Sequence, residues 1–279
     1  MNTATTVIEV RGLRNQFGAQ VVHENLDFEV RRGEIVGVVG GSGSGKSVLL
    51  RSIIGLNRPA AGSVTLLGTD MMRASDAQRI AIESRCGVLF QNGALFSSLS
   101  VADNVMVPMR EHHDLPLALM QRFAALKIAL AGLPADAGAK FPSQLSGGMV
   151  KRAALARAIA LDPDILFLDE PTAGLDPIGA AAFDQLILTL RDSLGLTVFL
   201  ITHDLDTLYT ICDRVAVLSQ KRVLVAGTLD QVERCDDAWV REYFQGPRGR
   251  SAFAASERVA HDARKHAAAN VAPGSRASG

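Results

Sequence analysis

Four glycines, three serines and one lysine make up the stretch GGSGSGKS, from Gly40 to Ser47. It follows the apolar run EIVGVV, typical of a buried strand, and precedes KSVLLRSIIGL, which has helical apolar spacing. A GxxxxGK[ST] pattern at such a turn forms a phosphate cradle, because glycines let successive backbone N–H groups point inward and the helix adds its positive N-terminal end. The stretch therefore predicts a loop that binds the phosphates of a nucleotide.

Two side chains of this loop have specific expected roles. The ammonium of Lys46 should reach the β- and γ-phosphates, and the hydroxyl of Ser47 should hold Mg²⁺. The predicted nucleotide-binding residues of the loop are Gly40, Gly41, Ser42, Gly43, Ser44, Gly45, Lys46, Ser47 and Val48. The alternative is a glycine-rich turn without a ligand, and the intact pattern in its required context argues against it.

The composition narrows the classes of protein that the chain can belong to. It has 279 residues, is 48% hydrophobic, and carries 29 Lys and Arg against 29 Asp and Glu. We therefore expect a globular chain with a sizeable core and no general attraction for nucleic acid. Cys86, Cys212 and Cys235 show no metal-ligand or disulfide spacing, which favours a reducing cytosol. Because no leader pattern or run of about 18 apolar residues occurs, we expect neither a membrane span nor export.

Short β-branched runs alternate with longer helical patterns along the chain. The runs are VIEV, NLDFEV, EIVGVV, CGVLF, DILFLD, LTVFLIT and RVAVLS. Apolar strands separated by helices predict an α/β fold with a mostly parallel sheet covered on both faces. Between about residues 97 and 160 the strand patterns stop, which predicts an inserted helical subdomain. We expect one domain over residues 1–245 and a tail over 246–279 that is partly disordered or contacts a partner.

The run DILFLDE ends in two acidic residues, Asp169 and Glu170. With a phosphate loop upstream, Asp169 is placed to organise the Mg²⁺ shell, and Glu170 to take a proton from an attacking water. The alternative is a pair of solvated caps at the end of a strand. The combination with the loop favours catalysis, so we predict hydrolysis of the bound nucleotide.

The sequence LSGG, residues 145–148, adds a second anion site. Ser146, Gly147 and Gly148 come just before a helix expected to start near Met149, and so offer exposed N–H groups. A plain helix-capping loop is the alternative. The order of phosphate loop, LSGG and DILFLDE resembles the nucleotide-binding subunit of ATP-binding cassette (ABC) transporters, over about residues 7–244.

The resemblance implies several further properties. It implies an ABC ATPase fold with an additional antiparallel β subdomain, and ATP as the nucleotide. It also implies a head-to-tail homodimer, in which each ATP lies between the phosphate loop of one subunit and the signature of the other. Ser146, Gly147 and Gly148 would then contact ATP in trans.

Four other residues match positions of the family. Gln91 matches the Q-loop glutamine, which reaches Mg²⁺ and the γ-phosphate, and His203 matches the switch histidine at that phosphate. Asp176 matches the D-loop at the dimer interface, in trans, and Phe17 stands where an aromatic ring stacks on adenine. Each has a structural alternative: a surface glutamine, a polar cap, a helix N-cap and a core phenylalanine.

The signature ends in Met149, where most of the family has glutamine. LSGGM, together with LFQNGALFSSLSVADNVMVPMREHHDLP, resembles the branch that serves the Mla phospholipid transport system of Gram-negative bacteria. That branch implies an integral-membrane permease, a lipid-binding MCE-domain protein and a STAS-domain protein as partners. It also implies a place on the cytoplasmic face of the inner membrane, with the permease docked around the Q-loop and residues 95–113.

Three other functions stay open at this point. The chain could serve an ABC importer for a small polar solute, or be a soluble ABC ATPase that drives no transport. It could also be a scaffold that ATP assembles without turnover, although the intact Glu170 and His203 argue against this. The tail after Gly246 is expected to wrap a neighbouring subunit or partner, because it is too weakly apolar to form its own core.

Overall fold

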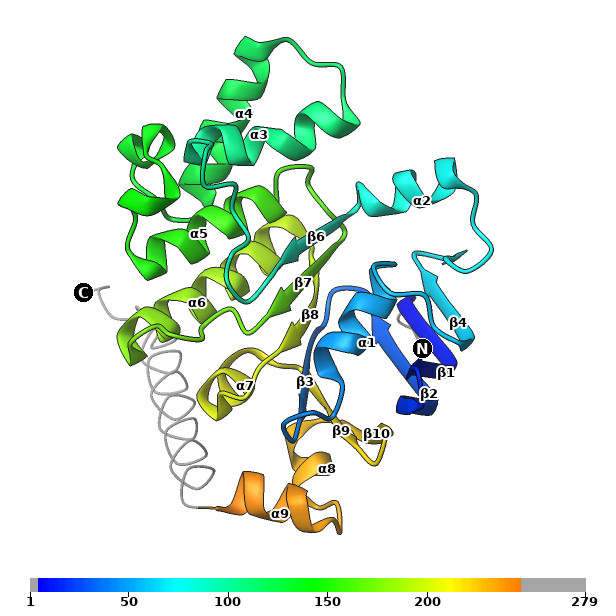
Figure 1. The fold of residues 1–279 in the computed structure, drawn as a ribbon. Helices are drawn as coiled ribbons and strands as arrows, with labels where there is room; N and C mark the ends of the chain where they lie inside the picture. Colours follow the sequence, from blue (N-terminus) through cyan, green and yellow to red (C-terminus); the bar gives the residue numbers. More distant parts are fainter. Residues whose placement is uncertain (1–4, 247–279) are drawn as a thin grey trace, which may run out of the picture.

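The computed structural model describes residues 5–246 and contains two β-sheets with helices around them (Figure 1). The strands are β1 Thr6–Phe17, β2 Gln20–Arg31, β3 Ile35–Gly40, β4 Ala61–Leu66, β5 Thr69–Asp70, β6 Cys86–Leu89, β7 Ile165–Asp169, β8 Thr197–Ile201, β9 Arg214–Ser219 and β10 Arg222–Gly227. The α-helices are α1 Lys46–Ile53, α2 Asp76–Glu83, α3 Val101–His112, α4 Leu117–Leu130, α5 Gly147–Ala158, α6 Pro177–Leu194, α7 Leu205–Ile211, α8 Leu229–Glu233 and α9 Ala238–Gln245. Two 3₁₀ turns, η1 Ala135–Ala139 and η2 Pro142–Gln144, lie between α4 and α5.

The larger sheet has the strand order β10-β9-β3-β8-β7-β6. All its pairs are parallel except the hairpin of β9 and β10. Every residue of β7 and β8 is buried, which is why these strands are apolar throughout rather than alternating. The predicted α/β fold with a mostly parallel sheet is confirmed.

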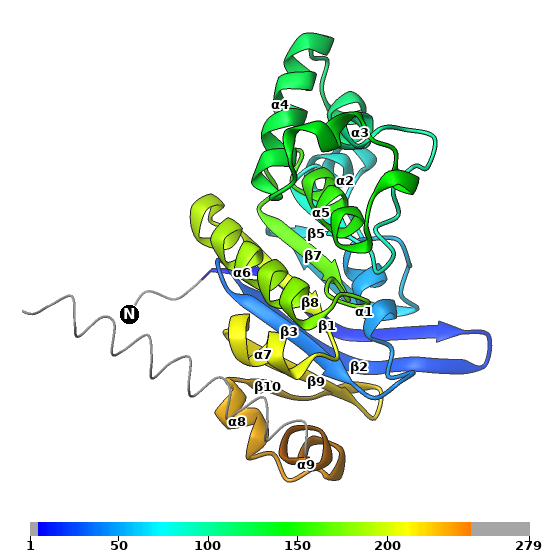
Figure 2. The ribbon, with the colours of Figure 1, turned by 90° about the vertical axis from the view of Figure 1, so that its left-hand side faces the viewer.

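Helices and a second sheet cover the two faces of this sheet. On one face, α1 and the antiparallel sheet β2-β1-β4-β5 enclose a core that includes Leu50 and Phe199. On the other face, α5, α6 and α7 pack through residues such as Phe183 and Ile211. Figure 2 shows α6 and α7 across the larger sheet from α1. The phosphate loop therefore leaves the sheet between two packed layers.

Strands β4, β5 and β10 are not among the predicted strands. β4 begins with Ala61 and Gly62, and β5 has two residues. β10 is an edge strand whose residues are mostly half-buried. These strands are held by pairing to their neighbours rather than by a continuous apolar run.

The segment predicted to be helical contains α3, α4, η1, η2 and α5, at the top of Figure 1. These elements share a core of their own, built from residues such as Val105, Ile128 and Ala153. The buried amide of Asn104 holds the preceding loop, because its oxygen accepts from the Phe96 N–H at 2.8 Å and its nitrogen donates to three loop carbonyls.

One predicted boundary is wrong: α5 begins at Gly147 and not near Met149. The hydroxyl of Ser146 accepts from the Met149 N–H at 3.3 Å, so Ser146 is the N-cap and the two glycines form the first turn.

Within residues 5–246, no helix is both long and apolar enough to span a bilayer. The three cysteines are free thiols. The expectation for the tail concerns residues 247–279, which lie outside the described part of the chain.

A buried acid lies between α6 and α7. Asp184 is 4% exposed, and one of its oxygens accepts from the Thr207 hydroxyl at 2.8 Å while the other has no partner among the described residues. Burial, above all, raises the pKa of Asp184 to about 6. The folded pKa thus lies above the ordinary aspartate value, so the ionised form opposes folding above pH 6 and the cost disappears as pH falls.

We expect Asp184→Asn to stabilise the chain by roughly 1–2 kcal/mol at pH 8, because it removes the buried charge and keeps an acceptor for Thr207. The gain should shrink towards zero near pH 4, where the wild-type carboxyl is protonated. Urea unfolding at several pH values measures both effects. A difference that does not change with pH would contradict this account.

Candidate functional site

The phosphate loop joins β3 to α1, and its glycines are required by close packing at two positions. A Cβ at Gly40 would lie 2.4 Å from the Leu218 carbonyl oxygen, and one at Gly45, where φ is +96°, would lie 2.4 Å from His23 Nε2. Any side chain at either place would push the loop out of position. With glycine at both positions the loop keeps its tight curve, and its backbone N–H groups can point towards a bound anion.

Lys46 lies inside the curve of this loop. Its ammonium donates to the carbonyls of Gly40 and Gly41, at 2.8 and 3.2 Å. Burial lowers the pKa of Lys46, while the nearby Glu170 and Asp169 raise it. The lysine therefore places a positive charge in the loop opposite two carboxylates.

Asp169 is the last residue of β7, and Ser47 is the second residue of α1. Burial, followed by the neighbouring Glu170, raises the pKa of Asp169, while a hydrogen bond with Ser47 lowers it. A hydroxyl and a carboxylate oxygen thus meet between β7 and α1. Hard oxygen donors of this kind fit Mg²⁺. The exposed Gln91 follows β6, and its side chain makes no hydrogen bond to either residue within residues 5–246.

Glu170 and His203 form a pair at the ends of β7 and β8. Glu170 Oε2 lies 2.7 Å from His203 Nδ1, and the Glu170 side chain is 13% exposed against 73% for His203. The pairing of Asp169 with Ile201 brings the two strand ends together. The result is a carboxylate facing an imidazole. The same carboxylate is close enough to Lys46 of the phosphate loop to raise the pKa of that lysine.

Phe17, at the end of β1, is 50% exposed. The core reading of this phenylalanine is therefore wrong, and its ring is accessible to a ligand. Asp176 caps α6 by accepting from the Gly179 N–H at 2.9 Å, so the N-cap alternative holds for this residue. Its side chain is exposed and also accessible to a second molecule.

The LSGG signature lies on a different part of the chain from the phosphate loop. Ser146 and Gly147 are exposed at the start of α5. Helix α5 packs against α3, α4 and β6, whereas α1 packs against β1, β3 and β4. The two groups of N–H donors therefore lie on helices that pack on opposite faces of the larger sheet.

A buried polar network under the phosphate loop has no signal in the sequence. Asn15 Oδ1 accepts from Ser52 Oγ and from Asn57 Nδ2, each at 3.0 Å, and Asn15 Nδ2 is 2.9 Å from His23 Nδ1. Burial lowers the pKa of His23 to about 4, so this ring is neutral at pH 7. The network ties the hairpin that carries Phe17 to the helix that carries Lys46.

Helix α9 adds two aromatic residues that the sequence did not indicate. The Tyr243 hydroxyl donates to the His203 carbonyl at 3.0 Å. Trp239 stacks on Tyr243, with ring centroids 4.6 Å apart. A Cβ added at Gly41 would lie 3.5 Å from Trp239 Nε1, so this indole is next to the phosphate loop. These rings span the gap between the histidine and the phosphate loop.

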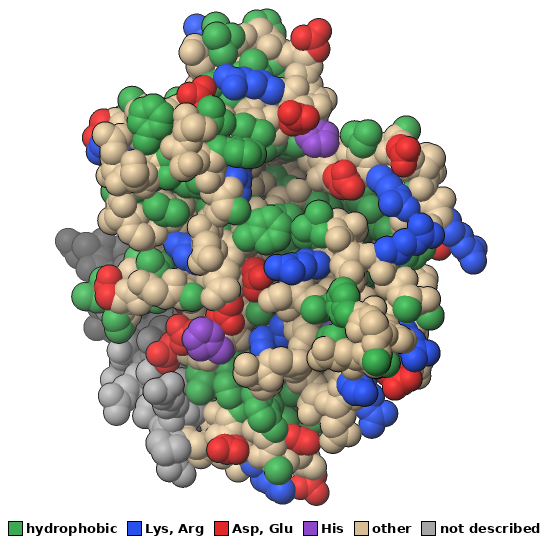
Figure 3. Space-filling view, viewed as in Figure 1, with side chains coloured by type: hydrophobic (Ala, Val, Ile, Leu, Met, Phe, Trp, Pro, Cys, Tyr) green, Lys and Arg blue, Asp and Glu red, His purple; other side chains and the backbone are tan. Residues whose placement is uncertain are grey.

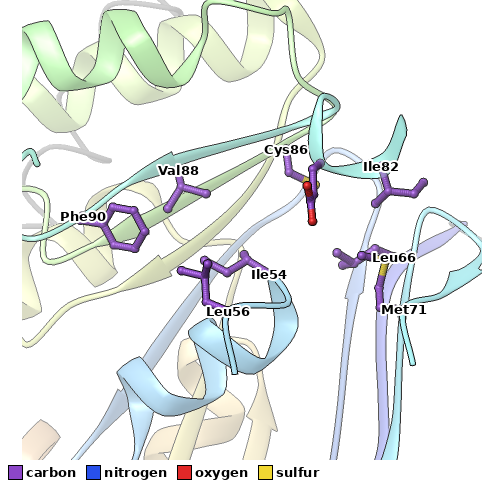
Figure 4. A pocket seen from close by; sticks show the side chains of 9 residues that line it. Ile54, Leu56, Leu66, Met71, Ile82, Cys86, Val88 and Phe90 are labelled. Carbon is purple, nitrogen blue, oxygen red and sulfur yellow. The ribbon is translucent and has the colours of Figure 1, made fainter. Parts of the chain in front are cut away.

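An apolar groove of about 320 Å³ opens between the end of α1, β4, α2 and β6. It is lined by Ile54, Leu56, Leu66, Met71, Ile82, Glu83, Cys86, Val88 and Phe90. Figure 4 shows Ile54 and Leu56 facing Val88 and Phe90 across the hollow. Apolar side chains also surround a hollow below the upper helices in the space-filling view (Figure 3). Because Leu56 is 66% exposed, the groove presents apolar surface beside the Q-loop position.

A profile of the ABC transporter family matches residues 23–173. The chain belongs to this family and is an ABC ATPase. It is 40% identical over 240 residues to the intermembrane phospholipid transport system ATP-binding protein MlaF of Haemophilus influenzae. The aligned region covers 86% of this chain and 90% of that protein. It is also 39% identical over 241 residues to the probable ribonucleotide transport ATP-binding protein mkl of Mycobacterium bovis, covering 86% of this chain and 67% of that protein.

A solved structure has the same fold. The dimeric ATP-binding cassette MJ0796, in a post-hydrolysis state bound to ADP and Pi, superposes with a TM-score of 0.73 at 28% identity. The match covers 80% of this chain and 98% of that chain. The family and fold implied by the motifs are confirmed.

We expect Asn15→Ala to lower the free energy of unfolding by about 2–4 kcal/mol, because it leaves Ser52, Asn57 and His23 without a shared buried partner. Denaturant titration measures the loss. Gln16→Ala is the matched control, since Gln16 is exposed and its amide donates to the nearby Gly18 carbonyl, and it should change stability by less than about 0.5 kcal/mol. Equal effects of the two substitutions would argue against a supporting role for the network.

Proposed function

We propose that this ABC ATPase energises phospholipid transport between the inner and outer membranes and so maintains outer-membrane lipid asymmetry. The observation that carries the site assignment is the gathering of Lys46, Asp169, Glu170 and His203 at the ends of β3, β7 and β8. The similarity to MlaF over most of both chains supports the phospholipid as the cargo. Transport of a small polar solute is the second candidate, and the similarity to mkl favours it.

ATP binding is assigned to the phosphate loop and to Phe17. The loop N–H groups and the positive end of α1 hold the phosphates, and Lys46 exchanges its two loop carbonyls for phosphate oxygens. The exposed ring of Phe17 stacks on adenine. Ser47, Asp169 and Gln91 would hold Mg²⁺, which would neutralise phosphate charge when bound.

Hydrolysis is assigned to the pair of Glu170 and His203. Glu170 accepts a proton from the attacking water as general base. Its bond with His203 Nδ1 orients the carboxylate and leaves the rest of the exposed imidazole to face the γ-phosphate. The water oxygen bonds to the γ-phosphorus as the bond to the β–γ bridging oxygen breaks, so that ATP gives ADP and phosphate, and Lys46 stabilises the negative charge that develops on the transferred phosphoryl group.

Two copies of the chain complete the site. Ser146, Gly147 and Gly148 present their N–H groups on an exposed helix start, where the ATP of a second subunit can meet them. The exposed Asp176 lies at the same interface. The dimeric state of the related cassette MJ0796 supports this arrangement.

The membrane partner is assigned to the groove beside β6. Its apolar lining and the exposed Leu56 suit the apolar face of a permease helix. This contact would hold the ATPase on the cytoplasmic face of the inner membrane. An MCE-domain lipid-binding protein and a STAS-domain protein are proposed as the further members of the complex, on the similarity to MlaF.

The assigned roles make opposite predictions for two variants. Glu170→Gln should lower kcat by about 10²–10⁴-fold while ATP still binds, so that a closed dimer accumulates with ATP. Lys46→Ala should instead weaken ATP binding and prevent that dimer. Phosphate release and size-exclusion chromatography with ATP measure the two properties. Rapid hydrolysis by Glu170→Gln, or tight dimers of Lys46→Ala, would overturn the assignments.

The cargo and the partners are tested together by isolating tagged Glu170→Gln protein from detergent-solubilised membranes of its source bacterium with ATP. We expect a multi-spanning permease, an MCE-domain protein and extractable phospholipid. A different permease with a solute-binding protein would move the cargo to a polar solute. Recovery of no membrane protein would leave a soluble ABC ATPase.

Leu56→Glu tests the groove in the same experiment. It places a charge on the apolar lining, so the permease should be lost from the isolated complex while the ATPase activity of the free protein is kept. Leu117→Glu is the control, because Leu117 is an exposed leucine at the start of α4 and outside the groove. Equal recovery of the permease with both variants would exclude the groove as its docking site.

A further inference from the structure

Lys151 is a buried cation on the signature helix α5. Lys151 is 6% exposed. Its ammonium donates to the backbone carbonyl of Gln91 and, at 3.1 Å, to that of Glu170. Gln91 and Glu170 are the Q-loop and general-base residues of the proposed site. A single side chain on the helix that follows LSGG therefore contacts two other motifs.

The charge of Lys151 is stabilised by its surroundings. Burial lowers its pKa, while Glu170 and then Asp169 raise it. A buried ammonium costs free energy unless it is hydrogen-bonded and anions lie nearby, and here it donates to two carbonyls with two acids close by. A neutral apolar residue at this position would satisfy neither carbonyl.

The carbonyl that Lys151 holds belongs to a strained residue. Glu170 has φ of +50°, a left-handed conformation that non-glycine residues rarely adopt. Its N–H donates to the Ile201 carbonyl at 2.9 Å, which holds the peptide unit before the Glu170 Cα. The Lys151 ammonium holds the carbonyl of the peptide unit after it, so the direction of the Glu170 side chain depends on both bonds.

The same helix also holds the loop that follows Gln91. The Arg157 guanidinium donates to the carbonyls of Gly93 and Ala94, at 2.8 and 2.6 Å. A Cβ at Gly93 would lie 3.1 Å from Val150 Cγ1, so this loop packs directly on α5. The loop and the signature helix are therefore held as one unit, and Lys151 joins this unit to the end of β7.

We propose that Lys151 is a positioning residue for ATP hydrolysis: it connects the backbone of Glu170 to the signature helix and the Q-loop of the same subunit. The inference depends on the roles proposed above for Glu170 and Gln91. Lys151 touches neither ATP nor the attacking water. A displacement of α5 when its signature meets the partner's ATP is transmitted through this ammonium to the Glu170 carbonyl.

The test compares Lys151→Met and Lys151→Arg with Arg152→Met. Methionine matches the unbranched apolar stem of the lysine and lacks its donors and charge, while arginine keeps donors and charge. Arg152 is the next residue of α5, and its guanidinium donates to the Ala131 carbonyl within the helical part, so it controls for loss of one cation from this helix. The measurements are kcat and KM for ATP with purified protein, and dimer formation with ATP in a Glu170→Gln background.

We expect Lys151→Met to lower kcat by about 10–100-fold while KM changes less than about twofold and the dimer still forms, because substrate contacts are intact and the general base is misplaced. Lys151→Arg should recover most of kcat, and Arg152→Met should match the wild type.

Two results would overturn the proposal. One is a kcat of Lys151→Met equal to that of Arg152→Met. The other is a fall in kcat together with a raised KM and a lowered melting temperature, which would show a purely structural role. If Lys151→Met does not fold, Lys151→Gln takes its place in the same comparison, and failure of both to fold gives the structural result. Glu170→Gln is assayed in parallel. If that variant hydrolyses ATP normally, the failure lies in the role assigned to Glu170; if it is inactive while Lys151→Met is normal, the failure lies in this inference.

Discussion

The parallel pairing of β3, β8 and β7 determines where each part of the site lies. Strands β7 and β8 are buried on both faces, so their backbone groups must be satisfied by neighbouring strands and their register is closely defined. Ile201 of β8 pairs with Val38 of β3 and with Asp169 of β7. The phosphate loop, the acidic pair and the switch histidine therefore leave the sheet at one edge, where ligands of open parallel sheets bind.

Charge is arranged around this edge in a balanced way. Burial, followed by the charge of the neighbouring Glu170, raises the pKa of Asp169. Lys46 and Lys151 are each electrostatically coupled to both acids. The two cations lie on helices that pack on opposite faces of the larger sheet, α1 and α5, so the balance of charge at the site depends on how both helices are placed. Electrostatics and backbone geometry thus favour one arrangement of the site.

The sequence predicted the parts of the site whose chemistry is local. The phosphate loop needs glycines and a lysine at fixed spacing, and β7 needs an apolar run before Asp169, so both can be found in a single short segment. Lys151, Tyr243 and the partners of Asn15 could not be found this way. Their contacts join residues far apart in the chain and depend on tertiary packing rather than on spacing. The start of α5 was misjudged because Ser146 caps two glycines, which are poor helix formers, in its first turn.

The high exposure of His203 has a consequence for an isolated subunit. Water competes for the bonds of a side chain that is 73% exposed, whereas Glu170 beneath it is largely shielded. On the roles proposed here, a second subunit that covers this histidine would dry the site and strengthen the Glu170–His203 bond at the moment ATP is enclosed. The monomer would then be a slow hydrolase by construction, and cellular ATP would be protected until two subunits close around it.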